Sequence, residues 1–374
     1  MRSLVNPWQD DPSDRIASGA PRTVSIRDLA RHLNVSIGTV SRALNGKADV
    51  SADTRRRVLA AAQELGYSPN QSGRSLRQGV TGMIALVLPT SGKMALADTI
   101  FMEVIEGLRA FLAGRNLDLM VLLSGPEENA FAYLQRGAAR RLADGLIIAE
   151  TQRSDPRIDY LIEKEIPFVC FGRSESGSGY PWVDLDFEGV AEDAVAHLAA
   201  LGHRRLAVAT AASDINYSYI FANAFRRALE RRGLPFDPDL VIRVENSDDG
   251  GCEFGDRILA MHRPPTAAIL VNEFMAIGLY RSMKEHGLLP GRDLAVVGFQ
   301  EEPNSRLLTP RVTCFRTALP ALGARLGEAL LATIPAHAPP EIAGRIIQEL
   351  WPMEFVPGES DGPPLAPGRS AAGG

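Results

Sequence analysis

The sequence has little cysteine and no long apolar run. Three cysteines, Cys170, Cys252 and Cys314, are scattered along 374 residues, with no CxxC pair and no His-rich spacing around them. Neither a disulfide framework nor a zinc site is therefore predicted, and a reducing cytoplasm fits this usage best. The longest apolar runs, such as 83–88 and 117–123, have the length of strands rather than of a membrane span.

Signatures of catalysis and of export are absent as well. The sequence contains no GxxxxGKS, GxxxxGKT, GxSxG or HExxH motif and no complete GxGxxG after an apolar run, and its histidines show no metal spacing. We therefore predict that the protein is not an enzyme and uses no cofactor or metal. Residues 1–22 carry acidic residues and prolines where a signal peptide needs a basic start and an apolar stretch, so export is not expected.

Charge is distributed unevenly along the chain. The net charge is −5, but residues 21–80 carry ten Lys and Arg against four Asp and Glu, a balance of +6 that leaves −11 for the remainder. A compact basic block on an acidic body is typical of a nucleic-acid-binding head joined to a soluble partner domain. A solvated basic face has the same charge, so the interpretation depends on the motifs within the block.

Three short helices are predicted within this basic block. Ser25, Ser36 and Ser51 each precede an apolar face with helical spacing and can cap its first turn, and Gly66 is placed to end the third helix. Only Asn-Val-Ser separates the first two helices, and so short a connection predicts a helix-turn-helix.

From residue 82 the pattern changes to alternating strands and helices. Seven apolar runs are predicted to be strands: MIALVLP, LDLMVLLS, GLIIAE, PFVCFG, RRLAVAT, AAILVN and DLAVVGF. Helices are expected at 99–113 and near 129–142. The predicted fold class is α/β, with an all-α helix-turn-helix head followed by two lobes that are each a doubly wound parallel sheet. A cleft between the lobes, at the carboxyl ends of their strands, is the expected small-molecule site.

The head carries a specific resemblance. Residues 25–70, SIRDLARHLNVSIGTVSRALNGKADVSADTRRRVLAAAQELGYSPN, closely resemble the head of the lactose/galactose repressor family, whose pattern is VSxxTVSRxLN followed by VSxxTRxxVxxAxxxLGYxPN. The order of segments such as ADGLII, VDLDFEGV and LAVVGF makes the body similar to the periplasmic-binding-protein-like core of the same family. The resemblance implies a transcription factor that binds double-stranded operator DNA.

In that family the second helix of the head enters the major groove. Arg42 can form a bidentate pair with guanine, worth about 1–3 kcal/mol of discrimination. Ile37 and Gly38 occupy positions that commonly read bases: Ile37 can pack on a thymine methyl group, whereas Gly38 offers no side chain. The remaining polar residues are suited to gripping phosphates, or to capping helices, above all Ser51. The implied DNA-binding residues are Ser25, Ile26, Ser36, Ile37, Gly38, Thr39, Ser41, Arg42, Asn45, Ser51, Thr54, Tyr67, Asn70, Gly73 and Leu76.

Residues 70–80 resemble the hinge of the family, which folds into a short helix on operator DNA. Leu76 occupies the place of the paired leucines that wedge into the minor groove at the operator centre. Gly73 stands where the family usually has Ala, which lowers helix propensity by about 1 kcal/mol. Folding of this hinge is therefore expected to depend more strongly on DNA.

The effector pocket departs from that of sugar-binding members. By matched position, Phe221 replaces an Arg, Gln300 replaces an Asp and Leu319 replaces an aromatic residue. Asn272 is retained, with Glu273 after it in place of Asp, and a ligand contact is favoured over a plain helix cap for Asn272.

For some of the other pocket candidates, a ligand contact and a structural role are equally supported. For the rest, packing in the core is the alternative to a ligand contact. Arg173, Glu273 and Gln300 can contact a ligand or serve the structure, while Trp182 and Phe221 can form an apolar platform for a sugar ring or pack in the core. The candidate effector-binding residues are Arg173, Trp182, Phe221, Asn272, Glu273 and Gln300.

Five segments are predicted along the chain. They are a disordered extension (1–22), the helix-turn-helix domain (23–69), the hinge (70–80), the effector-binding and dimerisation domain (81–356) and a disordered Pro/Gly/Ser-rich tail (357–374). Within the body, one lobe is expected to comprise about 81–183 with 317–350, and the other about 184–316 with 351–356.

The predicted function is that of a repressor controlled by a small molecule, a sugar or sugar derivative, bound between the lobes. It is expected to act in the cytoplasm, at the nucleoid when bound, as a homodimer on a pseudo-palindromic operator, with no membrane partner. The tail lacks the leucine repeat through which some family members tetramerise. A ligand-dependent activator or a corepressor-dependent regulator of the same fold stays open as an alternative. The basic head argues against a solute-binding receptor for transport.

Overall fold

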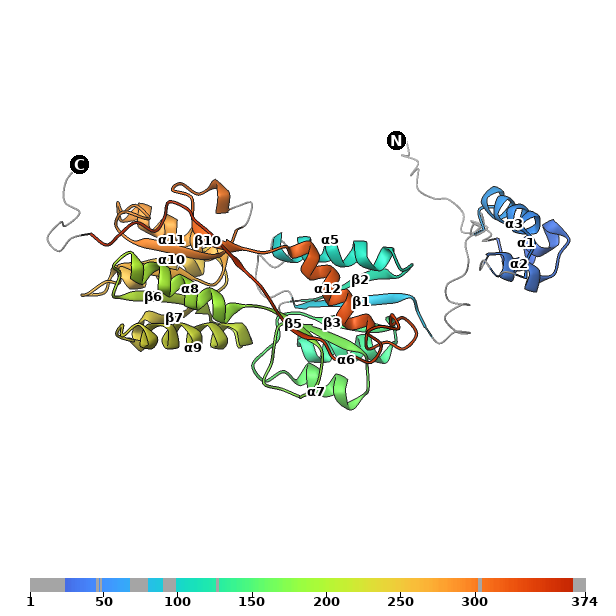
Figure 1. The fold of residues 1–374 in the computed structure, drawn as a ribbon, viewed down its shortest axis with the longest axis horizontal. Coiled ribbons are helices and arrows are strands. Elements are labelled where there is room, and N and C mark those ends of the chain that lie inside the picture. The colour runs from blue at the N-terminus through green and yellow to red at the C-terminus, as the bar shows by residue number, and fades with distance from the viewer. Residues whose placement is uncertain are drawn as a thin grey trace, which may run out of the picture. The chain divides into compact units, whose positions relative to one another are not determined.

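The chain forms two compact units that divide between residues 79 and 80. The computed structural model describes residues 24–44, 47, 49–67, 80–89, 99–125, 128–301 and 305–365. Predictions for residues 1–22, for the hinge before residue 80 and for residues 366–374 lie outside this range. The first unit is the helical head and the second is the α/β body (Figure 1).

The described part of the head is built from three helices, α1 (Ile26–Leu33), α2 (Ile37–Leu44) and α3 (Ala52–Glu64). Ser25 caps α1: its hydroxyl accepts the Asp28 N–H, and the Asp28 carboxylate accepts the Ser25 N–H, which together form a capping box. Asn34 ends the helix in the left-handed region (φ 54°), which Asn tolerates better than most residues. The helices enclose a small core of Leu29, Ala30, Val40, Ala43, Val50, Val58, Ala61 and Ala62.

The first lobe of the body, the N-lobe, is a six-stranded parallel sheet with strand order β11-β5-β4-β3-β1-β2. Its strands are β1 (Met83–Pro89), β2 (Asp118–Ser124), β3 (Gly145–Ile148), β4 (Phe168–Phe171), β5 (Trp182–Leu185) and β11 (Gln348–Trp351). Helices α5 (Thr99–Ala113) and α12 (Leu319–Leu331) cover one face, and α6 (Ala130–Ala139) and α7 (Pro156–Glu163) cover the other (Figure 1).

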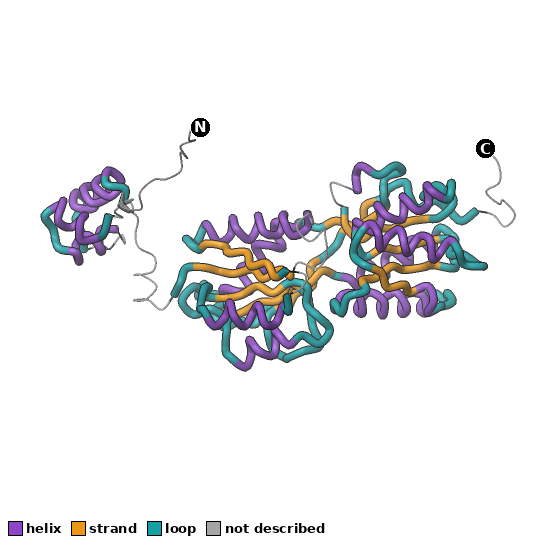
Figure 2. Tube along the Cα trace, turned by 180° about the vertical axis from the view of Figure 1, so that it is seen from behind, coloured by secondary structure: helices purple, strands orange, loops and turns teal. Residues whose placement is uncertain are grey.

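The second lobe, the C-lobe, repeats this plan with strand order β12-β10-β9-β8-β6-β7, parallel except for the antiparallel edge strand β12. Its strands are β6 (Leu206–Ala211), β7 (Val241–Val244), β8 (Ala267–Leu270), β9 (Ala295–Gln300), β10 (Thr313–Arg316) and β12 (Glu354–Val356). Helices α8 (Phe187–Ala200) and α9 (Asn216–Arg231) lie on one face, and α10 (Asp248–Leu259) and α11 (Glu273–Glu285) on the other; Figure 2 shows the same layers from behind.

The predicted fold class is confirmed, and each of the seven apolar runs contains a strand. The chain passes between the lobes three times, after β5, after β10 and after β11. Helix α6 ends at Ala139 rather than near 142. Strands β5, β7, β10, β11 and β12 were not predicted; they span only three or four residues, and β11 alternates exposed and half-buried positions at a sheet edge.

The prediction that the chain is disordered from residue 357 is wrong for residues 357–365. Ser360 is fully buried: its hydroxyl donates to the Val296 carbonyl at 2.6 Å and accepts the Thr313 N–H at 2.9 Å. A Cβ atom on Gly358 would lie 2.4 Å from the backbone nitrogen of Thr313. The small residues of this segment therefore allow a close backbone approach to the C-lobe, and their abundance does not signal disorder.

Replacing Ser360 with Ala is expected to lower the free energy of unfolding by about 1–3 kcal/mol, because a buried N–H and a buried carbonyl each lose a partner. Chemical denaturation of the full chain measures the change. Ser154 is exposed, so Ser154→Ala is the matched control and should stay within about 0.5 kcal/mol of the wild type. Equal stabilities of the two variants would contradict the assigned role of Ser360.

Candidate DNA-binding helix and effector cavity

The start of α2 is held by its own hydroxyl groups. Ser36 Oγ accepts the Thr39 N–H at 3.0 Å and lies 2.9 Å from Thr39 Oγ1. Ser51 and Thr54 repeat the arrangement at the start of α3, with 3.2 Å and 2.9 Å for the same two contacts. All four residues therefore have a capping or helix-start role in the head alone. Ser36 and Ser51 stay exposed, which leaves their hydroxyls accessible to a phosphate oxygen.

Arg42 is exposed on the side of α2 opposite its packing residues, Val40 and Ala43. Its Nε lies 3.3 Å from Asp49 Oδ2, an exposed ion pair that contributes little and is easily exchanged for another acceptor. A Cβ atom built on Gly38 would lie 3.7 Å from Arg42 Nη1, an ordinary contact. Gly38 therefore leaves open the surface along which the Arg42 guanidinium extends.

The other predicted DNA-binding residues occupy varied positions. Ile37 is exposed, with 46% of its surface accessible, whereas Ile26 and Tyr67 pack partly against the head core and Ser41 is half-buried. Burial raises the pKa of Tyr67. Asn45, Asn70, Gly73 and Leu76 lie outside the described residues.

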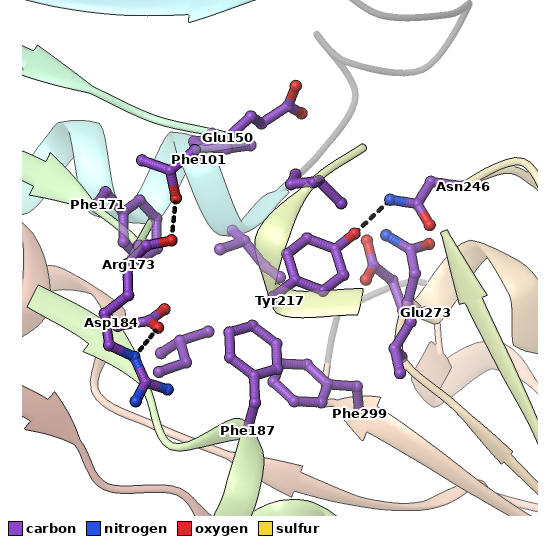
Figure 3. A pocket seen from close by; sticks show the side chains of 17 residues that line it. Phe101, Glu150, Phe171, Arg173, Asp184, Phe187, Tyr217, Asn246, Glu273 and Phe299 are labelled. Atoms are coloured by element: carbon purple, nitrogen blue, oxygen red, sulfur yellow. Dashed lines mark hydrogen bonds and ion pairs between the residues drawn. The ribbon is translucent and has the colours of Figure 1, made fainter. Parts of the chain in front are cut away.

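The body contains a cavity at the junction of the two lobes (Figure 3). It holds about 740 Å³ of space, counting solvent at its opening, which is enough for a small molecule. Every lining segment is the carboxyl end of a strand or the start of a helix. The lining residues are Ile100, Phe101, Glu150, Thr151, Phe171, Gly172, Arg173, Asp184, Leu185, Phe187, Ile215, Tyr217, Asn246, Val271, Asn272, Glu273 and Phe299.

Three stacked aromatic rings form one wall of the cavity. The Phe187 ring lies between the rings of Tyr217 and Phe299, at centroid distances of 5.0 Å and 4.8 Å and with interplanar angles of 9° and 13° (Figure 3). Phe101 and Phe171, which meet edge to face, add apolar surface from the N-lobe. Such walls suit the flat or apolar face of a ring-shaped ligand.

Arg173 is the cation in the described lining of the cavity, and two carboxylates hold it. Its Nε donates to Asp184 Oδ2 at 2.7 Å, and its Nη1 and Nη2 donate to the two oxygens of Glu188 at 3.1 and 2.7 Å. Burial acts to lower the pKa of Arg173, but the bonds to Glu188 and Asp184 outweigh it and hold the pKa above its usual value. Burial raises the pKa of Asp184 to about 6, against the opposing effect of Arg173.

Two asparagines enter the cavity from the C-lobe. Asn272 caps α11, since its Oδ1 accepts the Phe274 N–H at 2.9 Å, which leaves its Nδ2 to donate elsewhere. Asn246 Nδ2 donates to the Tyr217 hydroxyl, while the buried Asn246 Oδ1 has no hydrogen-bond partner among the described residues. Glu273, which is 3% exposed, lies beside Asn272 on the same wall.

Half of the predicted effector-binding residues line this cavity. Arg173, Asn272 and Glu273 do, whereas Trp182, Phe221 and Gln300 do not. Trp182 is the first residue of β5, and the cavity lies at the other end of that strand. The Trp182 ring packs against the Arg173 guanidinium.

The interpretation of Phe221 as a platform is corrected by its position in the core. It is fully buried and meets Phe299 edge to face, one helical turn beyond Tyr217. Gln300 is 3% exposed, and its Oε1 has no hydrogen-bond partner among the described residues. Leu319, at the position of a family aromatic residue, is buried at the start of α12.

Several lining residues were not predicted. Phe187 and Tyr217 lie in the first turns of α8 and α9, and Asp184 and Asn246 lie at or just after the ends of β5 and β7. The signal available in the sequence was their place at a strand-to-helix transition, but β5 and β7 themselves were not predicted. Phe299 lies inside an apolar run and has no such signal.

The two lobes are joined beside the cavity by backbone hydrogen bonds. Thr151 O accepts the Asn216 N–H at 2.9 Å, and Asp214 O accepts the Arg153 N–H at 3.1 Å. Asn216 Nδ2 also donates to the Arg173 carbonyl at 2.8 Å, and the Arg153 guanidinium lies 5.0 Å from the centre of the Tyr219 ring. The segment after β3 is therefore paired with the segment before α9, and the lobes are held together at this edge.

No group of three or more His, Cys, Asp or Glu side chains in the described part of the chain is arranged to hold a metal ion. None of its helices is long and apolar enough to cross a bilayer.

Comparison with known proteins gives consistent matches for both units. Residues 25–70 match the model of bacterial regulatory proteins, lacI family, and residues 195–360 match a periplasmic binding protein-like domain. The HTH-type transcriptional regulator AglR of Rhizobium meliloti (strain 1021) is 35% identical over 354 residues, which covers 93% of this chain and 96% of AglR.

The solved structures that share the fold include the following two. A lac repressor dimer bound to operator and the anti-inducer ONPF has a TM-score of 0.78 at 22% identity, covering 91% of this chain and 100% of the repressor. A complex of the transcriptional regulator CelR with cellobiose has a TM-score of 0.69 at 24% identity, covering 90% and 99%.

Proposed function

Because this chain belongs to the lacI family of bacterial regulatory proteins and is a DNA-binding transcriptional regulator under ligand control rather than an enzyme, we propose that it is a repressor acting as a homodimer on a pseudo-palindromic operator. A carbohydrate bound between the lobes is the signal that changes its operator affinity. The protein acts in the cytoplasm, at the nucleoid when bound to its operator.

The head supports the DNA-binding half of this proposal. Its α2 helix presents an exposed Arg42 and an exposed Ile37, with the hydroxyls of Ser36 and Ser51 at the starts of α2 and α3. Phosphate contacts at helix starts fix the position of the head, and Arg42 reads a base. The lac repressor neighbour is a dimer on operator DNA, and the same arrangement is proposed for this chain.

The observation that carries the ligand-binding half is that the cavity is built from both lobes. Arg173 and Asp184 come from the N-lobe, while Asn246, Asn272 and Glu273 come from the C-lobe. A molecule that contacts both sets binds one arrangement of the lobes better than another, which is what coupling between two sites requires. The CelR neighbour holds cellobiose, and a saccharide is proposed here on the same basis.

Selection of DNA from a random library by the full chain tests the proposal. An inverted repeat is expected, and titration with saccharides should weaken binding by about 5- to 150-fold for the signal molecule. An unpaired half-site would contradict the homodimer. A saccharide that tightens binding would contradict induction and indicate a corepressor instead.

Two substitutions of Asn272 distinguish its role as the cap of α11 from its proposed role as a ligand contact. Asn272→Asp keeps an oxygen that caps α11 but removes the Nδ2 donor, whereas Asn272→Ala removes both. Both variants are expected to lose most of the thermal stabilisation by the saccharide that releases the operator, while only the Ala variant loses about 1 kcal/mol of stability without ligand. Full stabilisation of the Asp variant would show that Asn272 only caps the helix.

A further inference from the structure

The two lobes are tied together at two separate places. One tie is covalent: the three passages of the chain leave β5, β10 and β11, which lie toward one edge of each sheet. The other tie consists of hydrogen bonds between residues 151–153, which follow β3, and residues 214–216, which follow β6. Strand β4 separates β3 from β5, and β8 and β9 separate β6 from β10. In the N-lobe the two ties are therefore two strand spacings apart, about 10 Å.

Both ties border the cavity. Leu185 and Phe187 flank the first covalent passage, while Thr151 and Ile215 belong to the hydrogen-bonded segments, and all four residues line the cavity. A rotation of roughly 15° that swings the lobes apart about the covalent passages would separate the hydrogen-bonded segments by about 3 Å, which no hydrogen bond tolerates. Widening the cavity in this way therefore requires these segments to part.

The hydrogen-bonded segments form a short antiparallel bridge. Gln152 lies opposite Ile215, and two backbone bonds of 2.9 and 3.1 Å flank this pair. Asn216 adds a third bond, from its Nδ2 to the Arg173 carbonyl at 2.8 Å. Because Asn216 is 5% exposed, water competes poorly for the bonds that its N–H and its side chain donate to the N-lobe.

A buried ion pair holds the N-lobe side of the bridge in place. Asp155 is 0% exposed and Arg157 is 3% exposed. Arg157 Nη2 donates to the carbonyls of Ala149 and Glu150 at 3.2 and 2.9 Å. Asp155 Oδ2 accepts the Arg157 guanidinium at 2.7 Å and the Gln152 N–H at 3.0 Å. The N-lobe segment is therefore preorganised for pairing by contacts within its own lobe.

Exposed side chains flank the bridge. The guanidinium groups of Arg153, from the N-lobe, and Arg243, from the C-lobe, lie 5.0 and 4.7 Å from the centre of the Tyr219 ring. Arg153 also pairs with Glu175 at 2.9 Å. Contacts of exposed charges are individually weak, so the bridge joins the lobes without locking them.

We propose that residues 151–153 and 214–216 form a latch that holds the lobes together, and that a small molecule enters the cavity only when this latch opens. The proposal rests on the proposed function only in taking a small molecule as the occupant of the cavity. It adds how that molecule gains access, and it places control of access in residues that do not line the cavity, above all Asn216.

Asn216→Pro weakens the latch selectively. Asn216 is the first residue of α9, a position that accepts proline, and Ile215 before it is already extended (φ −76°, ψ 132°). Proline removes both donors that Asn216 offers to the N-lobe. Ala130→Pro is the matched control, because Ala130 is the first residue of α6, follows the extended Asn129 (φ −65°, ψ 111°) and lies outside the latch.

Arg153→Cys combined with Asp214→Cys locks the latch. These two residues lie opposite each other, next to the Gln152–Ile215 pair, and the Arg153 N–H donates to the Asp214 carbonyl. Opposed residues of this kind have Cα atoms about 5.5 Å apart, which is within the span of a disulfide. Neither residue lines the cavity, so oxidation fixes the latch and leaves the lining unaltered.

The labelling rate of a reporter thiol measures access to the cavity. Asn246→Cys places the thiol in the lining, and N-phenylmaleimide is an uncharged reagent about as large as a sugar ring. Fragmentation mass spectrometry distinguishes label at residue 246 from label at Cys252. The reporter is present in every arm: the parent, Asn216→Pro, Ala130→Pro and the oxidised double-cysteine protein.

Relative to the parent, Asn216→Pro is expected to label at least about tenfold faster and the oxidised protein at least about tenfold more slowly, while Ala130→Pro matches the parent. The proposal is overturned if the oxidised protein labels as fast as the parent, or if a folded Asn216→Pro protein does not label faster. No DNA or saccharide enters this assay. A working latch in a chain that ignores saccharides would therefore refute the proposed signal alone, and equal labelling rates in a saccharide-responsive regulator would refute the latch alone.

Discussion

Gly278→Ala is expected to lower the free energy of unfolding of the body by more than about 3 kcal/mol and its melting temperature by about 10 °C. A Cβ atom on Gly278 would lie 1.8 Å from the carbonyl oxygen of Asp248 and 2.6 Å from the nitrogen of Cys252. Both contacts are backbone atoms of α10, so no flexible side chain can move aside. The helices α10 and α11 would have to separate.

The same contact is made from the other helix. A Cβ atom on Gly251 would lie 2.1 Å from the carbonyl oxygen of Met275, so each helix of the pair presents a glycine to the backbone of the other. Separation would also disturb the packing between Leu279 of α11 and Gly255 of α10, since a Cβ atom on Gly255 would lie 3.0 Å from Leu279 Cδ1. Because α11 begins with Asn272 and Glu273, the same shift should also weaken saccharide binding.

Gly137→Ala is the matched control for this prediction. Gly137 lies inside α6, and a Cβ atom there would be 3.8 Å from Leu122 Cδ1, an ordinary contact. Ala in that place should raise stability by about 0.5–1 kcal/mol, since Gly is costly in a helix interior. Urea unfolding of both variants makes the comparison, and a Gly278→Ala protein as stable as the wild type would show that the helices can part at little cost.

Arg42→Ala is expected to remove most of the base preference at one position of each half-site, a loss of about 1–3 kcal/mol of discrimination. The side chain is exposed, contributes nothing to the head core and gives up only an exposed pair with Asp49 when it turns to DNA. Because Gly38 offers no side chain and Ile37 can contact only a methyl group, no neighbour on this surface of α2 replaces the lost contact.

Selection of DNA by the variant head in the full chain measures the preference directly. Arg57→Ala is the control, since Arg57 is an exposed residue of α3 and removes the same charge. Arg57→Ala should at most weaken binding to all sequences alike and reduce its salt dependence. If the two variants select the same sequences as the wild type, Arg42 does not read a base.

The architecture of the lobes was predictable because buried parallel strands leave continuous apolar runs. Runs such as MIALVLP and DLAVVGF mark β1 and β9 without ambiguity. The short strands were not predictable: β11 (QELW) and β12 (EFV) carry charged residues because they lie at sheet edges. Residues 357–365 were misjudged since composition alone cannot distinguish a small residue that a close contact requires from one in a disordered chain.

Residues of the cavity were predictable where they follow an apolar run of the sequence, and were not predictable where they lie within such a run or within a helix. Arg173, Asn272 and Glu273 lie within about three residues of the end of β4 or β8 and reach the cavity. The resemblance supplies a position in α9 but not the rotation of the helix, so the predicted residue, Phe221, lies one turn beyond the residue that reaches the cavity. Tyr217, four residues earlier on the same face, is the aromatic residue that lines the cavity.

The three passages between the lobes have a genetic consequence. The N-lobe takes α12 and β11 from the end of the chain, and the C-lobe takes β12 and the segment that buries Ser360. A stop codon between β10 and β11 would therefore leave both sheets without an edge strand and expose apolar surface in each. Alleles truncated in that interval should behave as complete losses of the regulator, whereas a fragment ending before β1 keeps α1, α2 and α3 of the head.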